Sequence, residues 1–271
     1  VGGCAHNIVL VGDQMQLSQP AHGAHPPGSG VSALDHLMQG LPTVPPDRGI
    51  FLARTFRMHT ELCRFVSDVF YDGRLESDET TAQQKLILED DADGVLAPTG
   101  LRFIEVEHEG NTQRSEEEAA RLDRTYRALL GQRWVNRKGE TNEITAADIL
   151  VVTPYNMQVN LLEDTLPRGA RVGTVDKFQG QEGAVVLISL ASSSGENIPR
   201  GLEFLFSRNR LNVAISRARC LSVLFASPAL LYTPCNSVQQ VRLVNTLCWT
   251  RAAAAQQRPG LFTPPSVAVA R

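Results

Sequence analysis

The stretch VGTVDKFQGQEGAVVLISL, residues 172–190, decides the fold of this chain. An apolar run at 172–175 ends in a polar cluster, and a second apolar run, 184–190, follows at once. Short apolar runs bounded by turn residues predict buried strands. The connection between them is crowded with side chains that form hydrogen bonds, namely Asp176, Lys177, Gln179, Gln181 and Glu182, and it contains Gly180 and Gly183. Such a connection is typical of a binding loop.

The rest of the chain alternates in the same way. Apolar strands are predicted at 8–11, 50–53, 101–107, 149–153 and 221–226. Helices are predicted at 32–38, 62–70, 157–166, 208–219 and 238–255, with one more that begins at Ser115. Ser115 followed by Glu118 is a capping-box signature. Strands that are apolar throughout and alternate with helices predict an α/β fold with a parallel sheet covered on both faces.

Composition limits the class of protein. With 271 residues and 42% hydrophobic residues, the chain can bury a core for one large domain, or for one domain and a fragment of another. We expect no membrane association, because no apolar run reaches the length of a membrane span. The start lacks both Met and a signal-peptide pattern, which predicts a piece of a longer chain. Five cysteines without paired spacing predict reduced thiols and a cytoplasmic location.

Charge and metal-binding residue types are less informative. The net charge is −3, with 13 acidic and 3 basic residues in 76–120 and 7 basic and 4 acidic residues in 171–220. The second segment is compatible with a polyanion partner, but on counts alone an unevenly charged, solvated surface is favoured. Cys4, His6, His22 and His25 match no familiar zinc spacing, so no metal site is predicted.

Five polar clusters occur at intervals along the chain. They are VGDQMQL (11–17), TFRMH (55–59), VTPYNMQ (152–158), VDKFQGQE (175–182) and the helical RLNVAISRAR (210–219). Ligands of parallel sheets bind beyond the carboxyl ends of the strands, and we expect the first four clusters at or near such ends. Each cluster alone has a simpler explanation as a turn or a charged surface. Together, in this order, they indicate a ligand site.

In that order the clusters resemble motifs III to VI of superfamily 1 helicases, in the 1B branch that contains the nonsense-mediated-decay RNA helicase and the Okazaki-flap nuclease-helicase. LVGDQMQLSQP is similar to motif III, and RTFRMHTELCRFVSDVFYDGRL to motif IV with its helix. TVDKFQGQE resembles motif V and NVAISRAR motif VI, and the resemblance covers about residues 8 to 250. Thr60, in place of the usual Pro, and Gly183-Ala184, in place of a charged pair, depart from the pattern.

The resemblance implies two RecA-like domains with ATP in the cleft between them. Residues 1–47 would be the C-terminal remnant of the first domain, which carries motif III. Residues 48–235 would be the second RecA-like domain, a parallel sheet flanked by helices. Residues 236–271 would be a C-terminal helix and a tail whose Ala/Pro/Gln composition predicts disorder.

The resemblance also implies roles for single residues, with ATP and Mg²⁺ as cofactors and single-stranded DNA or RNA as partner. Gln16 would sense the γ-phosphate beside Gly12 and Asp13. Arg57 and Arg217 would reach the phosphates, a role that suits the planar guanidinium. Glu182 would contact the ribose, and Gln179 and Gly180 would link the nucleotide cleft to the nucleic acid. Thr153 and Tyr155 would lie along the bound strand.

Half of such a motor is missing from the sequence. A phosphate-binding loop needs Gly-Lys followed by Ser or Thr, and none of the three lysines, Lys85, Lys138 and Lys177, has those neighbours. No acidic metal-binding pair precedes residue 11, and we interpret the acids of KLILEDD (85–91) as a surface loop. We therefore expect no ATP hydrolysis by this chain alone.

Two function classes remain open. In the first, an N-terminal RecA-like domain completes an ATP-dependent helicase. The motifs also resemble bacterial proteins in which a RecB-like nuclease precedes the helicase, which leaves a fused nuclease domain open. In the second, the chain is a non-catalytic nucleic-acid-binding or regulatory module derived from a helicase. A nucleophile-elbow hydrolase is not indicated, because no G-x-S-x-G is present.

Overall fold

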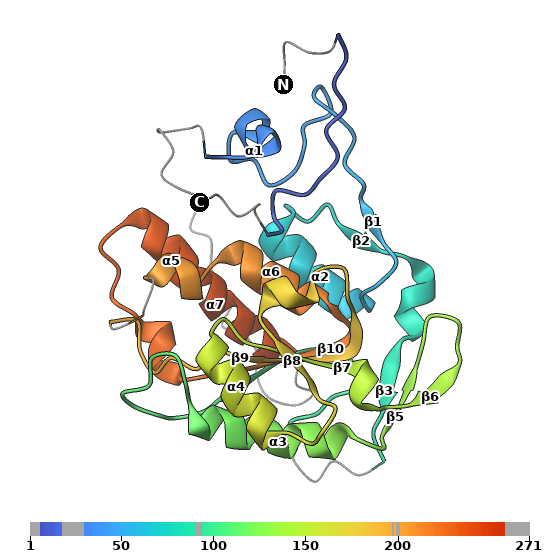
Figure 1. Ribbon diagram of the computed structural model, residues 1–271. Coiled ribbons are helices and arrows are strands. Elements are labelled where there is room, and N and C mark those ends of the chain that lie inside the picture. The colour runs from blue at the N-terminus through green and yellow to red at the C-terminus, as the bar shows by residue number, and fades with distance from the viewer. Residues whose placement is uncertain (1–5, 18–29, 90–93, 197, 199–200, 258–271) are drawn as a thin grey trace, which may run out of the picture.

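A five-stranded parallel sheet forms the centre of the molecule. The computed structural model describes residues 6–17, 30–89, 94–196, 198 and 201–257. The strands of the sheet are β4 (Gly100–Glu105), β7 (Ile149–Val152), β8 (Arg171–Gly173), β9 (Gly183–Ser189) and β10 (Ala218–Ala226). Their order across the sheet is β4-β10-β9-β7-β8, and every pairing is parallel. The predicted parallel sheet is confirmed (Figure 1).

Helices cover both faces of this sheet (Figure 1). One face packs against α2 (Thr60–Phe70), α6 (Arg208–Ser216) and α7 (Val238–Gln256). The other packs against α3 (Glu116–Leu129) and α4 (Asn156–Thr165). Successive residues of β7 alternate between the two cores, with Leu150 and Val152 on the first side and Ile149 and Val151 on the second. Both sets are buried, because neighbouring side chains of a strand point to opposite faces.

The smaller elements surround this sandwich. They are α1 (Ala33–Met38), α5 (Leu202–Leu205), the parallel pair β1 (Arg54–Thr55) and β2 (Glu76–Ser77), and the 3-10 turns η1 (Glu79–Gln83), η2 (Ala146–Asp148), η3 (Val175–Phe178) and η4 (Pro228–Tyr232). A three-stranded antiparallel sheet joins β3 (Lys85–Ile87), β5 (Arg133–Val135) and β6 (Thr141–Glu143). The β5–β6 hairpin was not predicted. Part of the expected 85–91 loop is strand β3 with Leu86 buried, whereas Glu89 is exposed as predicted and Asp90 and Asp91 lie outside the described residues.

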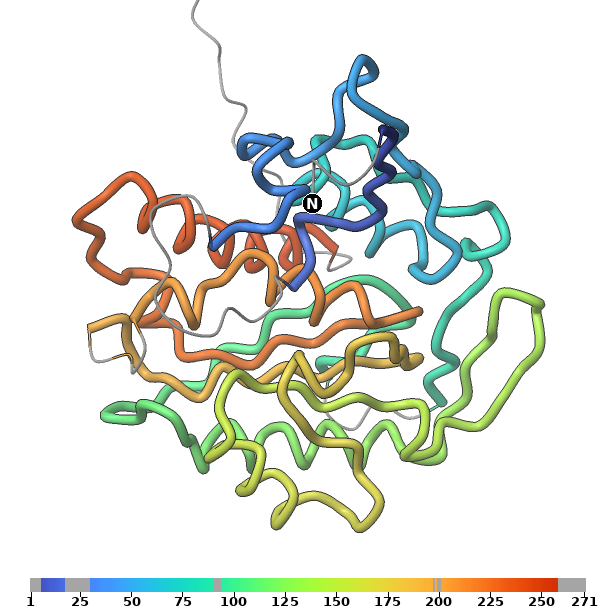
Figure 2. The backbone as a smooth tube through the Cα atoms, turned by 45° about the horizontal axis from the view of Figure 1, so that its top comes forward, coloured from blue at the N-terminus to red at the C-terminus, as the bar shows by residue number. Residues whose placement is uncertain are grey.

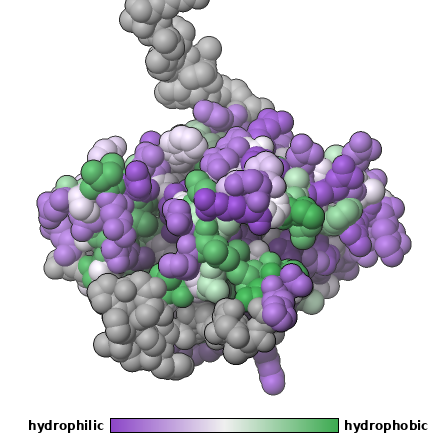
Figure 3. Space-filling view, turned by 90° about the horizontal axis from the view of Figure 1, so that it is seen from above, coloured by the Kyte–Doolittle hydropathy of each residue, from purple (hydrophilic) through white to green (hydrophobic). Residues whose placement is uncertain are grey.

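Two predicted strands near the N-terminus are wrong. Residues 8–11 and 50–53 form no strand, and Val9, Val11 and Ile50 are 85%, 90% and 88% exposed. A strand needs a neighbour hydrogen-bonded along its length, and neither run belongs to a described sheet. Ala53 accepts one backbone bond from Glu76 N at 2.7 Å, directly before β1. Seen from above, apolar side chains are exposed among hydrophilic ones on this side of the molecule (Figure 3).

The last helix belongs to the main core. Val244, Leu247 and Ala254 of α7 are buried against the sheet, and Leu101 N donates a hydrogen bond of 2.6 Å to Gln257 Oε1 just beyond the helix. The proposed domain boundaries near residues 47 and 235 stay predictions, and the tail from 258 to 271 lies outside the described residues. Among the described helices, none has the length and apolar character that crossing a membrane requires.

Candidate functional site

Three arginines converge on one carboxylate at the amino ends of β9 and β10. Arg57 Nε donates to Glu182 Oε2 at 2.6 Å. Arg219 donates to Glu182 Oε1 from Nε at 3.1 Å and from its terminal nitrogen at 2.6 Å. Arg217 lies next to this group, at the C-cap of α6, and interacts electrostatically with Arg57 and Glu182. We call these four residues the arginine cluster.

Glu182 is ionised at neutral pH because the arginines outweigh its partial burial. Burial raises the pKa of this carboxyl group. The hydrogen bonds and charges of Arg57 and Arg219 lower the pKa by more than burial raises it, so the pKa of Glu182 is below its ordinary value. Arg219 is held in turn by Trp134 of β5, with its guanidinium 5.4 Å from the centre of the indole ring. The cluster is therefore a fixed set of charges.

Arg217 is the least satisfied member of the arginine cluster. It is 5% exposed, and its Nε is buried without a hydrogen-bond partner among the described residues. Burial and then the repulsion of Arg57 lower the pKa of its guanidinium, against the opposing attraction of Glu182. A buried donor without an acceptor is costly, so a native structure that keeps one invites a functional explanation.

The N-terminal segment, residues 6–17, is bound to the middle of α6 and the end of α2 (Figure 2). Asp13 Oδ2 accepts hydrogen bonds from Gln16 Nε2 at 2.8 Å and from the Tyr71 hydroxyl at 2.7 Å. Burial, followed by the Asp13 charge, raises the pKa of the Tyr71 hydroxyl. Asn212 donates to the Tyr71 hydroxyl and to the carbonyl of Met15.

Asn209, one helical turn before Asn212, donates to the carbonyls of Gln14 and Gln16. The two asparagines thus fix the backbone of the segment that carries the predicted Asp13 and Gln16. Gly12 is exposed, and a side chain there would first meet Leu34, 3.3 Å away.

A separate cleft of 480 Å³ opens at the carboxyl ends of β7 and β8. We call it the tyrosine pocket, and its walls are Gln113, Pro154, Tyr155, Asn156, Met157, Thr174, Asp176 and Arg210. The centre of the Tyr155 ring lies 5.6 Å from that of Phe204, and the Arg210 guanidinium lies 4.4 Å from the centre of the Phe204 ring. Thr153 is fully buried beneath the pocket, and its hydroxyl has no partner among the described residues.

The connection 174–182 joins the tyrosine pocket to the arginine cluster. It begins at Thr174 and Asp176, in the walls of the pocket, and ends at Glu182, in the cluster. Gln179 and Gly180 lie between them and are exposed, and the φ of +79° at Gly180 favours glycine. At Gly183 a side chain would come within 2.8 Å of the Asp148 carbonyl, so glycine permits this close approach of two backbones.

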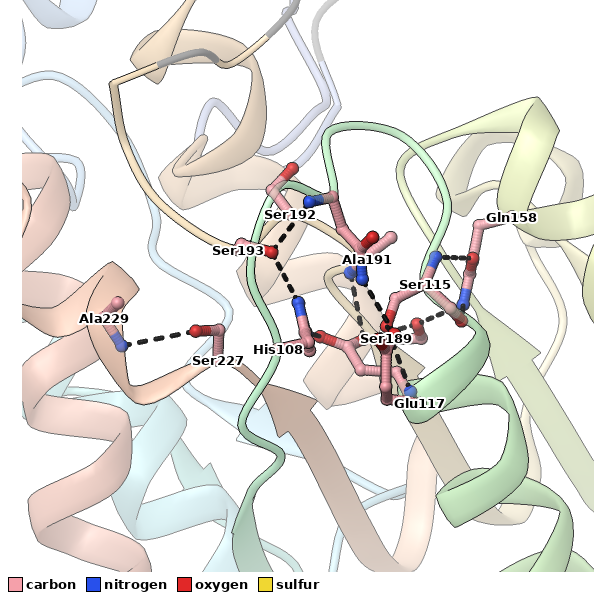
Figure 4. Close-up of polar contacts among 12 residues, drawn as sticks. His108, Ser115, Glu117, Gln158, Ser189, Ala191, Ser192, Ser193, Ser227 and Ala229 are labelled. Carbon is pink, nitrogen blue, oxygen red and sulfur yellow. Dashed lines mark hydrogen bonds and ion pairs between the residues drawn. The ribbon is translucent and has the colours of Figure 1, made fainter.

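A buried polar network joins α3 to the carboxyl end of β9 (Figure 4). The Glu118 carboxylate accepts from Ser189 Oγ at 2.6 Å and from Ala191 N at 2.9 Å, and it lies 3.0 Å from His108 Nε2. His108 Nδ1 lies 2.7 Å from Ser193 Oγ. These side chains are buried, and Ala191 is held at a φ of +63°.

This network corrects the predicted capping box. The Ser115 hydroxyl does accept from Glu118 N at 3.1 Å, but the Glu118 side chain does not return to the Ser115 backbone. Instead Ser115 N donates to Gln158 Oε1. Ser192, next to the strained Ala191, donates to the Thr112 carbonyl at 2.6 Å, and its Oγ lies 3.3 Å from the Tyr155 hydroxyl, so the network reaches the pocket wall.

The structure brings Arg57, Glu182 and Arg217 together but separates them from the other predicted site residues. Asp13 and Gln16 lie beside the middle of α6, and Thr153 and Tyr155 lie at the carboxyl ends of the strands. Cluster 55–59 does follow a strand, since Arg57 comes two residues after β1 of the small parallel pair. The expectation of a strand's carboxyl end is wrong for Glu182, which lies at the amino end of β9. The reason is the short connection 174–182, which carries its last residues back across the sheet.

Sequence reasoning missed several residues of these sites. Arg219 was predicted at the end of a helix over 208–219, but α6 ends at Ser216 and Arg219 is in β10, bound to Glu182. Tyr71 and Trp134 were also missed, and no local pattern marks either one. The i, i+3 spacing of Asn209 and Asn212 on a predicted helix was the available signal for the asparagine pair.

The donor groups of the arginine cluster fit a polyphosphate better than a metal ion. Guanidinium groups present hydrogen-bond donors only, and Arg217 keeps an unpaired one. Within the described ranges, no group of three His, Cys, Asp or Glu residues could hold a metal. Cys4, His22 and His25 lie outside those ranges.

Comparison with known proteins gives the wider context for this geometry. Residues 30–228 match the model of a family described as an AAA domain. The chain is 31% identical over 226 residues to the DNA polymerase alpha-associated DNA helicase A of Schizosaccharomyces pombe, covering 79% of this chain and 32% of that protein. It is 31% identical over 240 residues to a regulator of nonsense transcripts 1 homolog of Neurospora crassa, covering 84% and 21%.

The chain thus spans about a third or less of the length of these relatives. Among solved structures, an arterivirus nonstructural protein 10 (helicase) is 14% identical, with a TM-score of 0.29 over 64% of this chain and 25% of the other.

Proposed function

Because this chain belongs to the AAA domain family, in the superfamily 1 helicase branch of its relatives, we propose that it supplies the phosphate-sensing half of an ATP-dependent helicase or translocase. The observation that carries the proposal is Arg217, a buried guanidinium with an unpaired Nε beside Arg57. Arg57 and Arg217 repel each other, and Glu182, which also binds Arg219, offsets this repulsion only in part. A polyphosphate between or beside them would remove that repulsion.

In this proposal Arg57 and Arg217 neutralise the terminal phosphates of ATP, which supplies the phosphoanhydride bond to be broken. Catalysis of phosphoryl transfer depends mainly on positioning and charge neutralisation, which a fixed arginine provides. Glu182 orients Arg57 and contacts the ribose. Each Glu182 oxygen already accepts from an arginine and retains lone pairs for a hydroxyl donor.

We assign the nucleic-acid contacts to the tyrosine pocket. Tyr155 and Arg210 line it, and because Tyr155 is only 3% exposed, the charge of Arg210 is the group that suits a phosphate of a single strand. Thr153 and Gln179 would act with Tyr155, although Thr153 does so from beneath the pocket wall. DNA and RNA are both compatible with this chemistry.

The connection 174–182 would couple the two sites, since one short segment contributes to both. Its Asp176 end lies 4.0 Å from Arg210 in an ion pair, and its Glu182 end holds Arg57 and Arg219. A nucleotide that pulls on the arginines would therefore move a wall of the tyrosine pocket. Gly180 gives the connection a point of bending.

The remaining parts of the motor must come from a partner domain. Residues 1–47, with Gly12, Asp13 and Gln16, would be the edge of that first RecA-like domain. The lysine loop and the ligands of Mg²⁺ would lie in the rest of it, and a nuclease domain fused to it remains open.

A steady-state ATPase assay tests the proposal. We expect no turnover above background from this chain, with or without single-stranded DNA or RNA, and weak, salt-sensitive binding of single strands. Turnover stimulated by single strands and lost in Arg217→Ala would contradict the half-site, because it would require a phosphate loop within these residues.

The same substitution in the complete protein tests the role of Arg217 directly. We expect Arg217→Ala to cut turnover by about 10³-fold or more while nucleotide binding is nearly retained. Arg219→Ala, which releases only one side of Glu182, should act mainly on nucleotide affinity. Equal losses of turnover in the two variants would indicate that Arg217 has no special role. A complete protein that hydrolyses no ATP would also contradict this role, and it is the outcome expected of a regulatory module.

A further inference from the structure

We propose that the β5–β6 hairpin is an additional wall of the nucleotide site, and that Arg137 and Lys138 at its tip bind a phosphate group of the nucleotide. The inference rests on the proposed function and adds two residues to it. The hairpin faces three residues of the arginine cluster, Arg57, Glu182 and Arg219, across a cleft of 540 Å³, and Arg217 does not line this cleft. Ligand sites of small molecules commonly have this size.

The walls of the cleft come from two parts of the chain. On one side are Arg57, Glu182 and Arg219 of the arginine cluster, and on the other are residues of the hairpin tip, including Arg137 and Lys138. The cleft lies at the amino ends of the strands, whereas the tyrosine pocket lies at the carboxyl ends. A ligand that touches Arg57 and Glu182 is thus within the same space as the hairpin tip.

The charges in the cleft favour an anion. Five cations line it against two carboxylates, Glu140 and Glu182. Three of the cations have acidic partners, because Arg57 and Arg219 bind Glu182 and Arg54 lies 3.7 Å from Asp78. Arg137 and Lys138 are exposed and have no close ion pair among the described residues, although the charge of Arg137 also acts on Asp78. They are the charges left for a ligand.

The tip is held in place before any ligand arrives. Gln83 Nε2 donates to the Arg137 carbonyl at 2.5 Å, and Lys138 N donates to Asn136 Oδ1 at 2.8 Å. The neighbouring Gln84 donates to the Arg57 carbonyl at 2.7 Å. Two adjacent glutamines therefore fix opposite walls of the cleft, which lowers the ordering cost of binding.

The hairpin also carries a reporter of the site. Trp134 is 4% exposed and lies under the Arg219 guanidinium, whereas Trp249, the other tryptophan, is 51% exposed on α7. In a Trp249→Phe background, the fluorescence of Trp134 should respond to a ligand of the arginine cluster.

The experiment titrates this protein with ATP, inorganic triphosphate and adenosine. We expect ATP and triphosphate to change the fluorescence, and adenosine to do so much more weakly. Arg137→Gln/Lys138→Gln should weaken ATP binding about tenfold, which is the effect of two partly exposed charges on a phosphate. The control Arg124→Gln/Arg168→Gln removes two exposed arginines elsewhere, from α3 and the turn before β8, and should leave the affinity unchanged. Thermal unfolding checks that all variants fold.

Each other outcome overturns the inference in a recognisable way. Equal ATP affinity of the hairpin variant and the parent, with loss of binding in Arg57→Gln, would leave the proposed function intact and remove the hairpin from it. Loss of single-strand binding in the hairpin variant with unchanged ATP binding would assign the tip to nucleic acid. No response of the parent to ATP or triphosphate would overturn both the nucleotide site and the hairpin's part in it.

Discussion

Replacement of Arg217 by Met should make the protein more stable, although the same change removes the proposed phosphate sensor. Arg217 is 5% exposed, its Nε is unpaired, and Arg57 repels it. Met keeps an unbranched apolar stem but is shorter by the end of the guanidinium group, and it has neither the charge nor the donor. An unsatisfied buried donor costs about 1–3 kcal/mol, and replacement of buried charges by apolar groups of similar volume has stabilised other proteins by about 1–4 kcal/mol.

The attraction between Arg217 and Glu182 is lost in the variant and offsets part of this gain. The backbone bonds of the residue, such as Gly183 N to the Arg217 carbonyl at 3.1 Å, are unaffected. We therefore expect the free energy of unfolding to rise by about 1–2 kcal/mol, and the melting temperature by about 2–4 °C for each kcal/mol.

Urea unfolding followed by circular dichroism measures this difference, provided that the dependence on urea is unchanged. Arg219→Met is the matched control and should have the opposite sign. It removes two hydrogen bonds from Glu182, and since both side chains are about a third exposed, the loss should be about 1 kcal/mol. A decrease of more than about 1 kcal/mol in Arg217→Met would refute the reasoning, because it would mean that the guanidinium is satisfied in solution.

Three further predictions follow from other contacts. Glu182→Gln should lower the free energy of unfolding by about 1 kcal/mol at pH 7. Because the arginines lower the pKa of Glu182 in the folded state, this difference from wild type should vanish as acid protonates Glu182. Unfolding curves at pH 7 and about pH 3 measure the two differences. Tyr71→Phe should lower the free energy of unfolding by about 1–2 kcal/mol through the lost hydrogen bond to Asp13. Because the pKa of Tyr71 is raised in the folded state, wild type should lose more stability than the variant above about pH 10. An equal decrease of the free energy of unfolding with pH in both proteins would contradict this. Iodoacetamide should modify the partly exposed Cys235 before Cys63 and Cys220, since burial raises the pKa of those two thiols to about 11 and about 12, and peptide mass spectrometry after timed quenching would detect any reversal.

The central sheet was predictable because its strands have a clear local sequence pattern. Residues 149–152 and 184–188 are buried on both faces, so their runs are apolar without interruption. The β5–β6 hairpin lacks such a signal, because β6 is exposed at every position and β5 buries only Trp134. Its position depends on long-range pairing with β3, which no local pattern specifies.

The candidate site was predictable only in part. Resemblance selected Arg57, Glu182 and Arg217, and the fold brings them together, while the roles of all the predicted residues stay predictions. Arg219 was misplaced because the helix prediction ran past Ser216, and helix ends are poorly determined by periodicity. Local pattern was also insufficient for Glu118. Ser115 caps the helix as predicted, but the Glu118 carboxylate binds Ser189, which is distant in sequence.

The order of the strands across the sheet has a consequence for how the protein is made. Strand β4 is the first of the five to be synthesised, and its one neighbour in the sheet, β10, is the last. The helix α7, which covers β4, comes later still. During translation β4 therefore stays unpaired until nearly all of the domain has been synthesised. An unpaired apolar strand can associate wrongly with other chains. Cooperative folding is therefore expected only once α7 has left the ribosome, and removal of that helix should release aggregated chains rather than a smaller domain.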